Sequence, residues 1–193
     1  MNATSTITPP EIDAIVEEFC HKLAPGNTPI YVDVLPRVSA IQDECFFNVG
    51  QAVADEGGTI VFGWAIWLWP RVLIEANHHA VWGRPRSRLV DITPKADREN
   101  RILFLPDARQ VFDFQTFQRV DNVRQAIAND DDVRGLISFS QQIHALSQQW
   151  SDGRLIRMPQ AQQAQLLNLK RNCEICKKQM LKKFPAQNGA PIL

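Results

Sequence analysis

The sequence has few of the features that mark a special class of protein. Its 193 residues carry no net charge, since 21 Lys and Arg side chains balance 21 Asp and Glu, and it contains four cysteines. Hydrophobic residues make up 45% of the chain and charged residues 22%, which excludes an intrinsically disordered chain, a collagen and a coiled-coil rod. A chain of this length buries a core without a disulfide framework. We therefore expect a globular protein whose cysteines are free for other roles.

The sequence also lacks a long hydrophobic run. Its most apolar stretch, residues 59–69, is too short for a membrane-spanning helix and is followed by Pro70 and Arg71. No charged-then-apolar leader precedes the first helical pattern. These absences predict a soluble cytoplasmic protein in a reducing compartment, with no membrane partner.

The neutral total hides an uneven distribution of charge. Residues 154–184 hold eight Lys and Arg against a single acidic residue, Glu174. We therefore expect an α+β domain over residues 1–153 and a basic helical C-terminal tail over residues 154–193. Such a tail suits an acidic partner or the acidic body of the protein itself. It has neither interleaved aromatic residues nor a nucleic-acid motif, which argues against nucleic acid as the partner.

Hydrophobic periodicity predicts helices at both ends of the chain and strands between them. The helical patterns cover residues 8–26, 42–58, 121–130, 133–150 and 159–184, with Thr8 and Asp43 as the expected caps of the first two. The strand patterns cover residues 29–36, 59–69, 72–82, 88–94 and 101–107. This order predicts the α+β class, with a central antiparallel β-meander, a helix packed on it, and further helices at the N- and C-termini.

Cys45 lies in the first turn of the second predicted helix. A thiolate at a helix N-terminus is stabilised by the helix dipole and by backbone N–H groups that have no partner within the helix. Such a thiol has a lowered pKa and is a better nucleophile near neutral pH. Cys45 is therefore the candidate nucleophile.

His79 and Asp91 are the candidate partners of this thiol. On an ideal strand His79 shares a face with Glu75 and Asn77, whereas His78 shares the apolar face, and a β-bulge would exchange the two. A symmetric hairpin centred near Pro85 places His79 directly opposite Asp91. Asp91 would then fix the imidazole tautomer and stabilise its charged form, while the other ring nitrogen faces Cys45.

The segments QDECFFNV, ANHHAVW and LVDITP together resemble the papain-like cysteine hydrolase superfold, especially its NlpC/P60-like and transglutaminase-like branches. The resemblance covers roughly residues 43–106. It implies attack of the thiol on an amide or ester carbonyl, an acyl-enzyme, and then hydrolysis or transfer to an amine. The expected substrate is a peptide, a protein or a small amide.

The remaining site residues concern the oxyanion and the substrate. The Cys45 backbone N–H is the first oxyanion donor, Gln42 the nearest side-chain candidate for a second, and Asn48 an alternative. His78 is a further candidate next to the base. Four tryptophans gather near the site: Trp64, Trp67, Trp69 and Trp82. Core packing is the ordinary role of such residues, but one or two of them could wall a substrate cleft, and Trp64 is the named candidate.

Cys173 and Cys176 form a C-x-x-C pair in the basic tail. Zinc requires four ligands, and neither a second pair nor an adjacent His supplies the other two. We therefore expect neither a metal nor a cofactor.

Two classes of function fit these observations, with a third as an outlier. The first is a cysteine-dependent hydrolase or acyltransferase acting on amide bonds through Cys45, His79 and Asp91: a protease, amidase or deamidase. The alternative is a non-catalytic interaction module on the same scaffold, which binds a protein through an aromatic cleft or the basic C-terminal helix. A nucleic-acid-binding adaptor would instead show steeply salt-dependent binding through residues 154–184.

Overall fold

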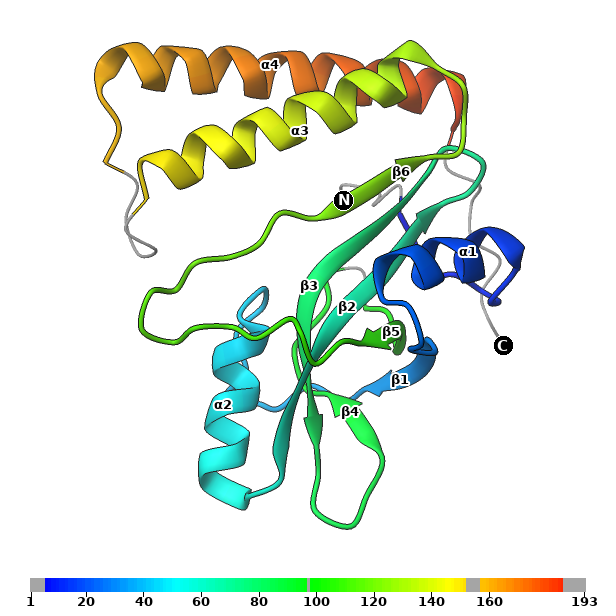
Figure 1. Ribbon diagram of the computed structural model, residues 1–193, viewed down its shortest axis with the longest axis vertical. Helices are drawn as coiled ribbons and strands as arrows, with labels where there is room; N and C mark the ends of the chain where they lie inside the picture. The colour runs from blue at the N-terminus through cyan, green and yellow to red at the C-terminus, as the bar shows by residue number, and fades with distance from the viewer. Residues whose placement is uncertain (1–5, 97, 152–156, 186–193) are drawn as a thin grey trace.

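A five-stranded barrel forms the centre of the molecule, and helices cover it, so the predicted α+β class is confirmed (Figure 1). The computed structural model describes residues 6–96, 98–151 and 157–185. The strands are β1 (Ile30–Val34), β2 (Thr59–Trp69), β3 (Leu73–Gly83), β4 (Leu89–Asp91), β5 (Arg101–Pro106) and β6 (Val123–Ala126). The helices are α1 (Ala14–Leu23), α2 (Cys45–Glu56), α3 (Asp131–Gln149) and α4 (Gln160–Lys183).

The strand order corrects the prediction of a central antiparallel meander. The order is β2-β5-β1-β4-β3, and pairing between β2 and β3 closes the ring, while β6 adds to the free edge of β3. Strand β1 lies between β5 and β4 and runs parallel to β4. The long β2–β3 hairpin curls far enough for β5 to return to β2, because twisted strands close readily into a barrel.

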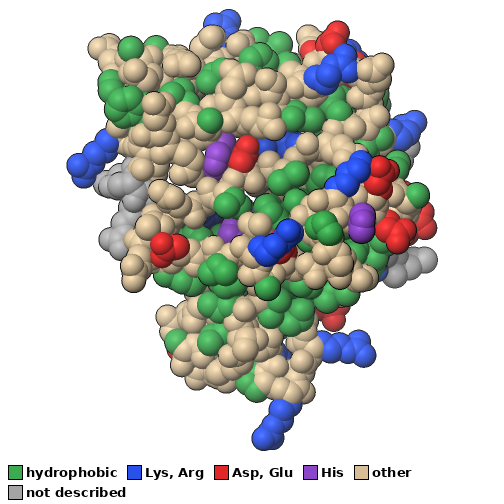
Figure 2. Space-filling view, in the orientation of Figure 1, with side chains coloured by type: hydrophobic (Ala, Val, Ile, Leu, Met, Phe, Trp, Pro, Cys, Tyr) green, Lys and Arg blue, Asp and Glu red, His purple; other side chains and the backbone are tan. Residues whose placement is uncertain are grey.

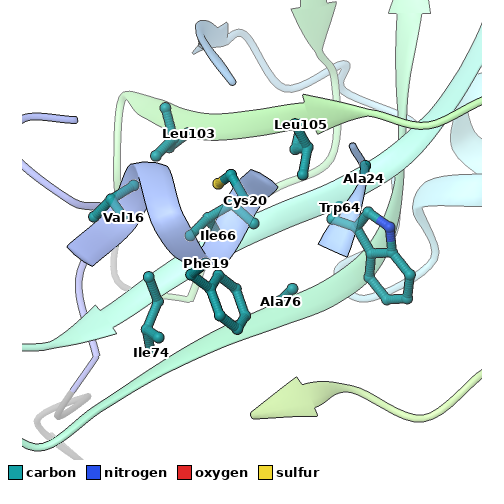
Figure 3. Close-up of a cluster of buried hydrophobic side chains, with 10 residues drawn as sticks. All are labelled: Val16, Phe19, Cys20, Ala24, Trp64, Ile66, Ile74, Ala76, Leu103 and Leu105. Carbon is teal, nitrogen blue, oxygen red and sulfur yellow. The ribbon is translucent and has the colours of Figure 1, made fainter. Parts of the chain in front are cut away.

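Both faces of the barrel wall are covered, which explains why β2 is apolar at both parities. The inner face holds residues such as Val81, Ile102 and Phe104. On the outer face, α1 packs Phe19 and Cys20 against the sheet (Figure 3). Helix α2 packs on another part of the outer face, and its contacts position the candidate nucleophile.

The turn between α2 and β2 depends on two glycines. Gly57 and Gly58 both have positive φ, at 76° and 91°. A Cβ at Gly58 would also overlap the carbonyl oxygen of Gly83. Other residues adopt this conformation only with strain, so the glycine pair sets where the helix ends and the long hairpin begins.

Both predicted helix caps were wrong, by five residues for α1 and by one residue for α2. Asp13, rather than Thr8, caps α1, and its carboxylate accepts a hydrogen bond from the Val16 N–H. The N-cap of α2 is Glu44, because Asp43 adopts a positive φ of 64°. Asp tolerates the left-handed region better than most residues, so Asp43 can turn the chain just before the helix.

The C-terminal part forms a helical hairpin. Helix α4 packs along α3, and Met180 and Val133 bury themselves against Trp69 and Val72 at the far end of the β2–β3 hairpin. Lys183 joins the two helices through Asp130 and Asp132, at 2.7 and 2.6 Å. The helical portion of the predicted basic tail is thus paired with a helix from the preceding segment.

The helix expected over residues 121–130 is instead strand β6. Its four residues pair with Leu73–Ala76 of β3. The local pattern suits a helix, but the open edge of β3 offers backbone hydrogen bonds, and this pairing overrides the local preference. None of the helices in the described ranges is long and apolar enough to cross a membrane.

Candidate active site

Cys45 is the first residue of α2 and lies at one end of the barrel. Its side chain is 5% exposed and packs beside Phe46 and Ala80. No side chain caps the helix, since Glu44 makes no capping hydrogen bond. The first N–H groups of a helix have no partner within the helix, so they are available to a negative charge near the Cys45 thiol.

His79 projects from β3, where it pairs with Gly63 of β2. Its Nε2 lies 2.8 Å from Oδ2 of Asp91, and both side chains are buried. The other carboxylate oxygen, Oδ1 of Asp91, accepts a hydrogen bond from the Thr93 N–H at 2.9 Å. Asp91 therefore holds the ring by Nε2 and leaves Nδ1 for the thiol.

The hairpin register behind this contact differs from the predicted one by two residues. Trp82 pairs with Val90, not with Arg88, so Asp91 is the diagonal rather than the direct neighbour of His79. The reason lies in the turn, where Ser87 N–H bonds to the Arg84 carbonyl and Arg86 has a φ of 58°. Pro85 thus occupies the second turn position rather than the centre. A shift of two preserves the face, so the side chains still meet.

Cys45 and His79 form an interacting pair. Burial opposes ionisation of Cys45, but the charge and hydrogen bond of His79, with the Ala80 N–H, lower the pKa of the thiol. Burial likewise opposes the imidazolium, but Asp91 and the Cys45 thiolate raise the pKa of His79 to about 9. Despite burial, His79 and Lys95 hold the pKa of Asp91 at about 2. The arrangement favours a thiolate–imidazolium pair supported by a carboxylate.

Lys95 also belongs to this cluster, and it was not among the residues predicted from the sequence. Its Nζ lies 2.6 Å from Oδ2 of Asp91 and 3.4 Å from Nε2 of His79. The Lys95 side chain is 10% exposed. It follows β4 in a loop without periodicity, so its spacing of four residues from Asp91 was the only available signal. Lysine and imidazole therefore share one carboxylate oxygen.

A cavity of about 320 Å³ opens above the cluster. On the face seen in Figure 2, histidine, acidic and basic side chains gather at a hollow below the helical pair. The cavity wall includes the inner face of the β2–β3 hairpin, the start of α2, the loop after β4 and the segment before β6. Its lining includes Cys45, His79, Lys95, Thr93, Asn77, Trp67, Glu75 and Arg119.

Two predicted oxyanion candidates do not line this cavity. Gln42 is exposed and its amide donates to Asp43 at 3.3 Å. Asn48 binds both backbone groups of Ile41, at 2.9 and 2.7 Å, and donates to Oγ1 of Thr93 at 3.1 Å. The Asn48 amide is thus used in holding the loop before α2. It also fixes the Thr93 hydroxyl, which keeps its own proton to donate.

Trp64 also lies away from the cavity. It packs under α1, and its indole N–H donates to Asp107 at 3.2 Å. Trp67 lines the cavity instead. The register explains the exchange: Gly63 pairs with His79, so odd-numbered residues of β2 share the face of His79 and Trp64 points to the opposite side.

His78 lines the cavity from the apolar side. Its ring centroid lies 4.7 Å from that of Phe46, and its Nε2–H donates to the Gln110 carbonyl at 3.3 Å. Burial lowers the pKa of His78, so this ring is neutral near pH 7. The neighbouring histidines therefore differ in charge as well as in direction.

The described residues contain no group of three or more His, Cys, Asp or Glu side chains placed to hold a metal ion. Cys173 and Cys176 lie on α4 toward α3, where Cys173 contacts Ser140 at 3.7 Å. Cys176 is buried close to Gly135.

Comparison with protein-family models finds no match, and comparisons with curated proteins and with solved structures also find none.

Proposed function

We propose that the protein is a cysteine-dependent hydrolase or acyltransferase that acts on amide bonds, with the papain-like arrangement of nucleophile, base and orienting carboxylate. The observation that carries the proposal is that Cys45, at a helix N-terminus, and His79 line one cavity, and that Nε2 of His79 is bound by Asp91 at 2.8 Å. All three side chains are buried, and Cys45 and His79 line a cavity. A nucleophile, a base and an orienting group in this relation are the parts of nucleophilic acyl transfer.

The acylation step uses the ion pair. The Cys45 thiolate attacks the amide carbonyl carbon, the C–S bond forms, and the carbonyl π electrons move to oxygen. The Cys45 N–H and the Thr93 hydroxyl stabilise this oxyanion. The imidazolium of His79 then gives its proton to the leaving nitrogen, the C–N bond breaks, and an amine departs from a thioester.

The second step releases the acyl group. Neutral His79 takes a proton from water, or from an acceptor amine, as the oxygen or nitrogen attacks the thioester carbonyl. The C–S bond breaks, and the thiolate–imidazolium pair is restored. Asp91 keeps the ring oriented through both steps and stabilises its positive charge.

Alkylation of individual cysteines tests the proposal without a known substrate. Iodoacetamide labelling is followed by peptide mass spectrometry between about pH 5 and 9, and each rate is divided by that of the same cysteine in the urea-unfolded chain. At about pH 6, below the ordinary thiol pKa of about 8.5, Cys45 in the folded protein should label at least about 10-fold faster than the same cysteine in the unfolded chain.

Two neighbouring histidines supply the matched variants. His79→Leu should reduce Cys45 labelling at pH 6 by about 100-fold, because the thiol loses its charged partner. His78→Leu preserves the packing against Phe46 and should leave the Cys45 profile in place. A Cys45 that titrates as an ordinary thiol in the folded wild-type protein would overturn the proposal.

The non-catalytic interaction module is a second candidate, favoured by one specific observation. The segment between β1 and α2 exposes three apolar side chains: Leu35 at 60%, Val38 fully and Ile41 at 65%. Exposed apolar side chains close together suit a protein contact. An inert Cys45, combined with binding of a protein partner that Val38→Asp abolishes, would favour this candidate.

A further inference from the structure

Two buried acceptor atoms at the cavity have no hydrogen-bond partner. In the described part of the chain, four buried side-chain polar atoms lack one. Two of these, on Trp150 and Gln162, belong to the C-terminal helical hairpin and its end. The other two, Oδ1 of Asn77 and Nδ1 of His78, belong to side chains that line the cavity. Because a buried polar atom without a partner is costly, such atoms favour binding of a group that hydrogen-bonds to them.

Asn77 lies on β3, the strand that carries His79 of the reactive pair. It lies two residues before His79 on β3, which places it on the same face at about 7 Å along the strand. It pairs across the hairpin with Ala65, whose small side chain leaves room above it. A chain that presents its carbonyl to Cys45 and extends along the hairpin face passes directly over Asn77.

The chemistry of these atoms limits the ligand group. Oδ1 of Asn77 accepts a hydrogen bond, and Nδ1 of His78 is also an acceptor, because Nε2 of His78 donates to Gln110. A ligand must therefore supply N–H groups, and an acyl ester with a hydrocarbon chain has none. A second amide supplies an N–H for Oδ1 and a carbonyl for the Nδ2 donor of Asn77, so that the two amides pair in both directions.

The adjacent polar side chains do not compete for this role. Glu75, one step further along β3, is bound by Arg124 at 2.6 Å and by Asn122 at 3.0 Å. Asp91 is bound by His79, Lys95 and Thr93. Their charges are already paired within the protein, whereas the Asn77 amide is free to bind a ligand.

We propose that Asn77, about 7 Å along β3 from His79, selects the substrate by binding a second amide next to the reacting one, so that the substrate is a peptide or a comparable chain of amides. The inference rests on the proposed function of Cys45, and it narrows the substrate class of that site. Simple amides and lipid esters lack the second amide and would be poorer substrates.

A pair of electrophiles tests the inference. Chloroacetyl-glycinamide carries a terminal carboxamide beyond its reactive carbon, and N-isobutyl-chloroacetamide replaces that carboxamide with an isopropyl group of similar shape. The readout is the ratio of Cys45 labelling rates with the two reagents, divided by the same ratio in the urea-unfolded chain. One or two new hydrogen bonds should give a preference of about 5- to 30-fold for the carboxamide.

Asn77→Leu should bring this ratio to about one, and because two reagents are compared within one variant, any general change in thiol reactivity cancels. Asn77→Val, which suits a strand, serves if the leucine variant does not fold. Asn122→Leu is the matched control, since the Asn122 amide is already bound to Glu75, and it should keep the preference.

The outcomes separate the two proposals. Fast Cys45 labelling without a carboxamide preference, or with a preference that survives in Asn77→Leu or is lost equally in Asn122→Leu, overturns the role of Asn77 and leaves the proposed function standing. A Cys45 that is inert to every reagent overturns both.

Discussion

Two buried cysteines, on helices packed against the same barrel, have pKa values shifted in opposite directions. Cys20 of α1 and Cys45 of α2 are 1% and 5% exposed, and each lies on a helix packed against the outside of the sheet. Burial raises the pKa of Cys20 to about 12, since apolar side chains surround it. Burial also opposes ionisation of Cys45, yet the pKa of Cys45 is lowered because His79 and a backbone N–H contact it.

The difference shows that burial alone does not determine what a cysteine can do. Cys20 lies near the C-terminal end of its helix, where the dipole disfavours a negative charge, and Cys45 lies at the N-terminal end of its own. The barrel supplies the remaining difference. Its rim places an imidazole and a carboxylate beside Cys45, whereas its wall gives Cys20 only hydrocarbon.

The largest change should come from removing the carboxylate that supports the charged site. Asp91→Asn removes the negative charge that the buried Lys95 ammonium and His79 ring share. Breaking a buried ionic contact on one side costs about 3–5 kcal/mol, which we expect as the fall in the free energy of unfolding in urea at pH 7. Cys45 labelling at pH 6 should also fall, since the imidazolium loses its partner.

Asp43→Asn is the matched control, because Asp43 also lines the cavity but is exposed. It should change the free energy of unfolding by less than about 0.5 kcal/mol. The contribution of Asp91 is present above the unfolded-state pKa of about 3.9 and is lost as pH falls toward its folded-state pKa of about 2. The difference between wild type and Asp91→Asn should therefore shrink below pH 4, and a constant difference would contradict this origin.

A smaller change in stability should come from replacing Cys20 with a side chain that does not suit its apolar surroundings. Cys20→Ser places a hydroxyl among Val16, Phe19 and Leu103. A buried hydroxyl without a partner costs about 1–3 kcal/mol in the free energy of unfolding, measured in urea. The labelling profile of Cys45 should not change, since the two cysteines belong to separate clusters. An altered Cys45 profile would show that the two regions are coupled.

Several features of the fold and the site could be predicted because they depend on local sequence. The apolar run of β2, the polar face of β3, the glycine pair before β2, and the place of Cys45 at a helix start all follow from neighbouring residues. The shared face of His79 and Asp91 was also predictable, because it survives a register error of two. The β2–β3 register, which places Trp67 and not Trp64 on the face of His79, would have chosen between the two tryptophans.

Other features depend on contacts between distant segments. Strand β1 inserts beside β4, where the Leu35 N–H bonds to the Asp91 carbonyl, and nothing in either segment alone encodes that parallel pairing. The barrel and the position of the loop that carries Lys95 both follow from it. Strand β6 likewise forms because β3 has a free edge, despite a local helical pattern.

The smallest effect concerns Lys95, whose charge competes with the imidazolium of His79 for Asp91. Lys95→Met keeps the length of the side chain and removes this competition, so the pKa of His79 should rise from about 9 by about one unit, equivalent to about 1.4 kcal/mol. The His79 pKa lies above its unfolded-state value, so its stabilisation is complete below about pH 6.5 and is lost as pH rises through about 9. Removing Lys95 should therefore move the loss of this stabilisation to higher pH. Titration of the ¹⁵N-labelled His79 ring by NMR measures the midpoint directly, with the exposed Lys22→Met as the control for loss of one positive charge. A midpoint that stays at the wild-type value, or moves down, would mean that Lys95 acts only by holding Asp91 in place and not by its charge.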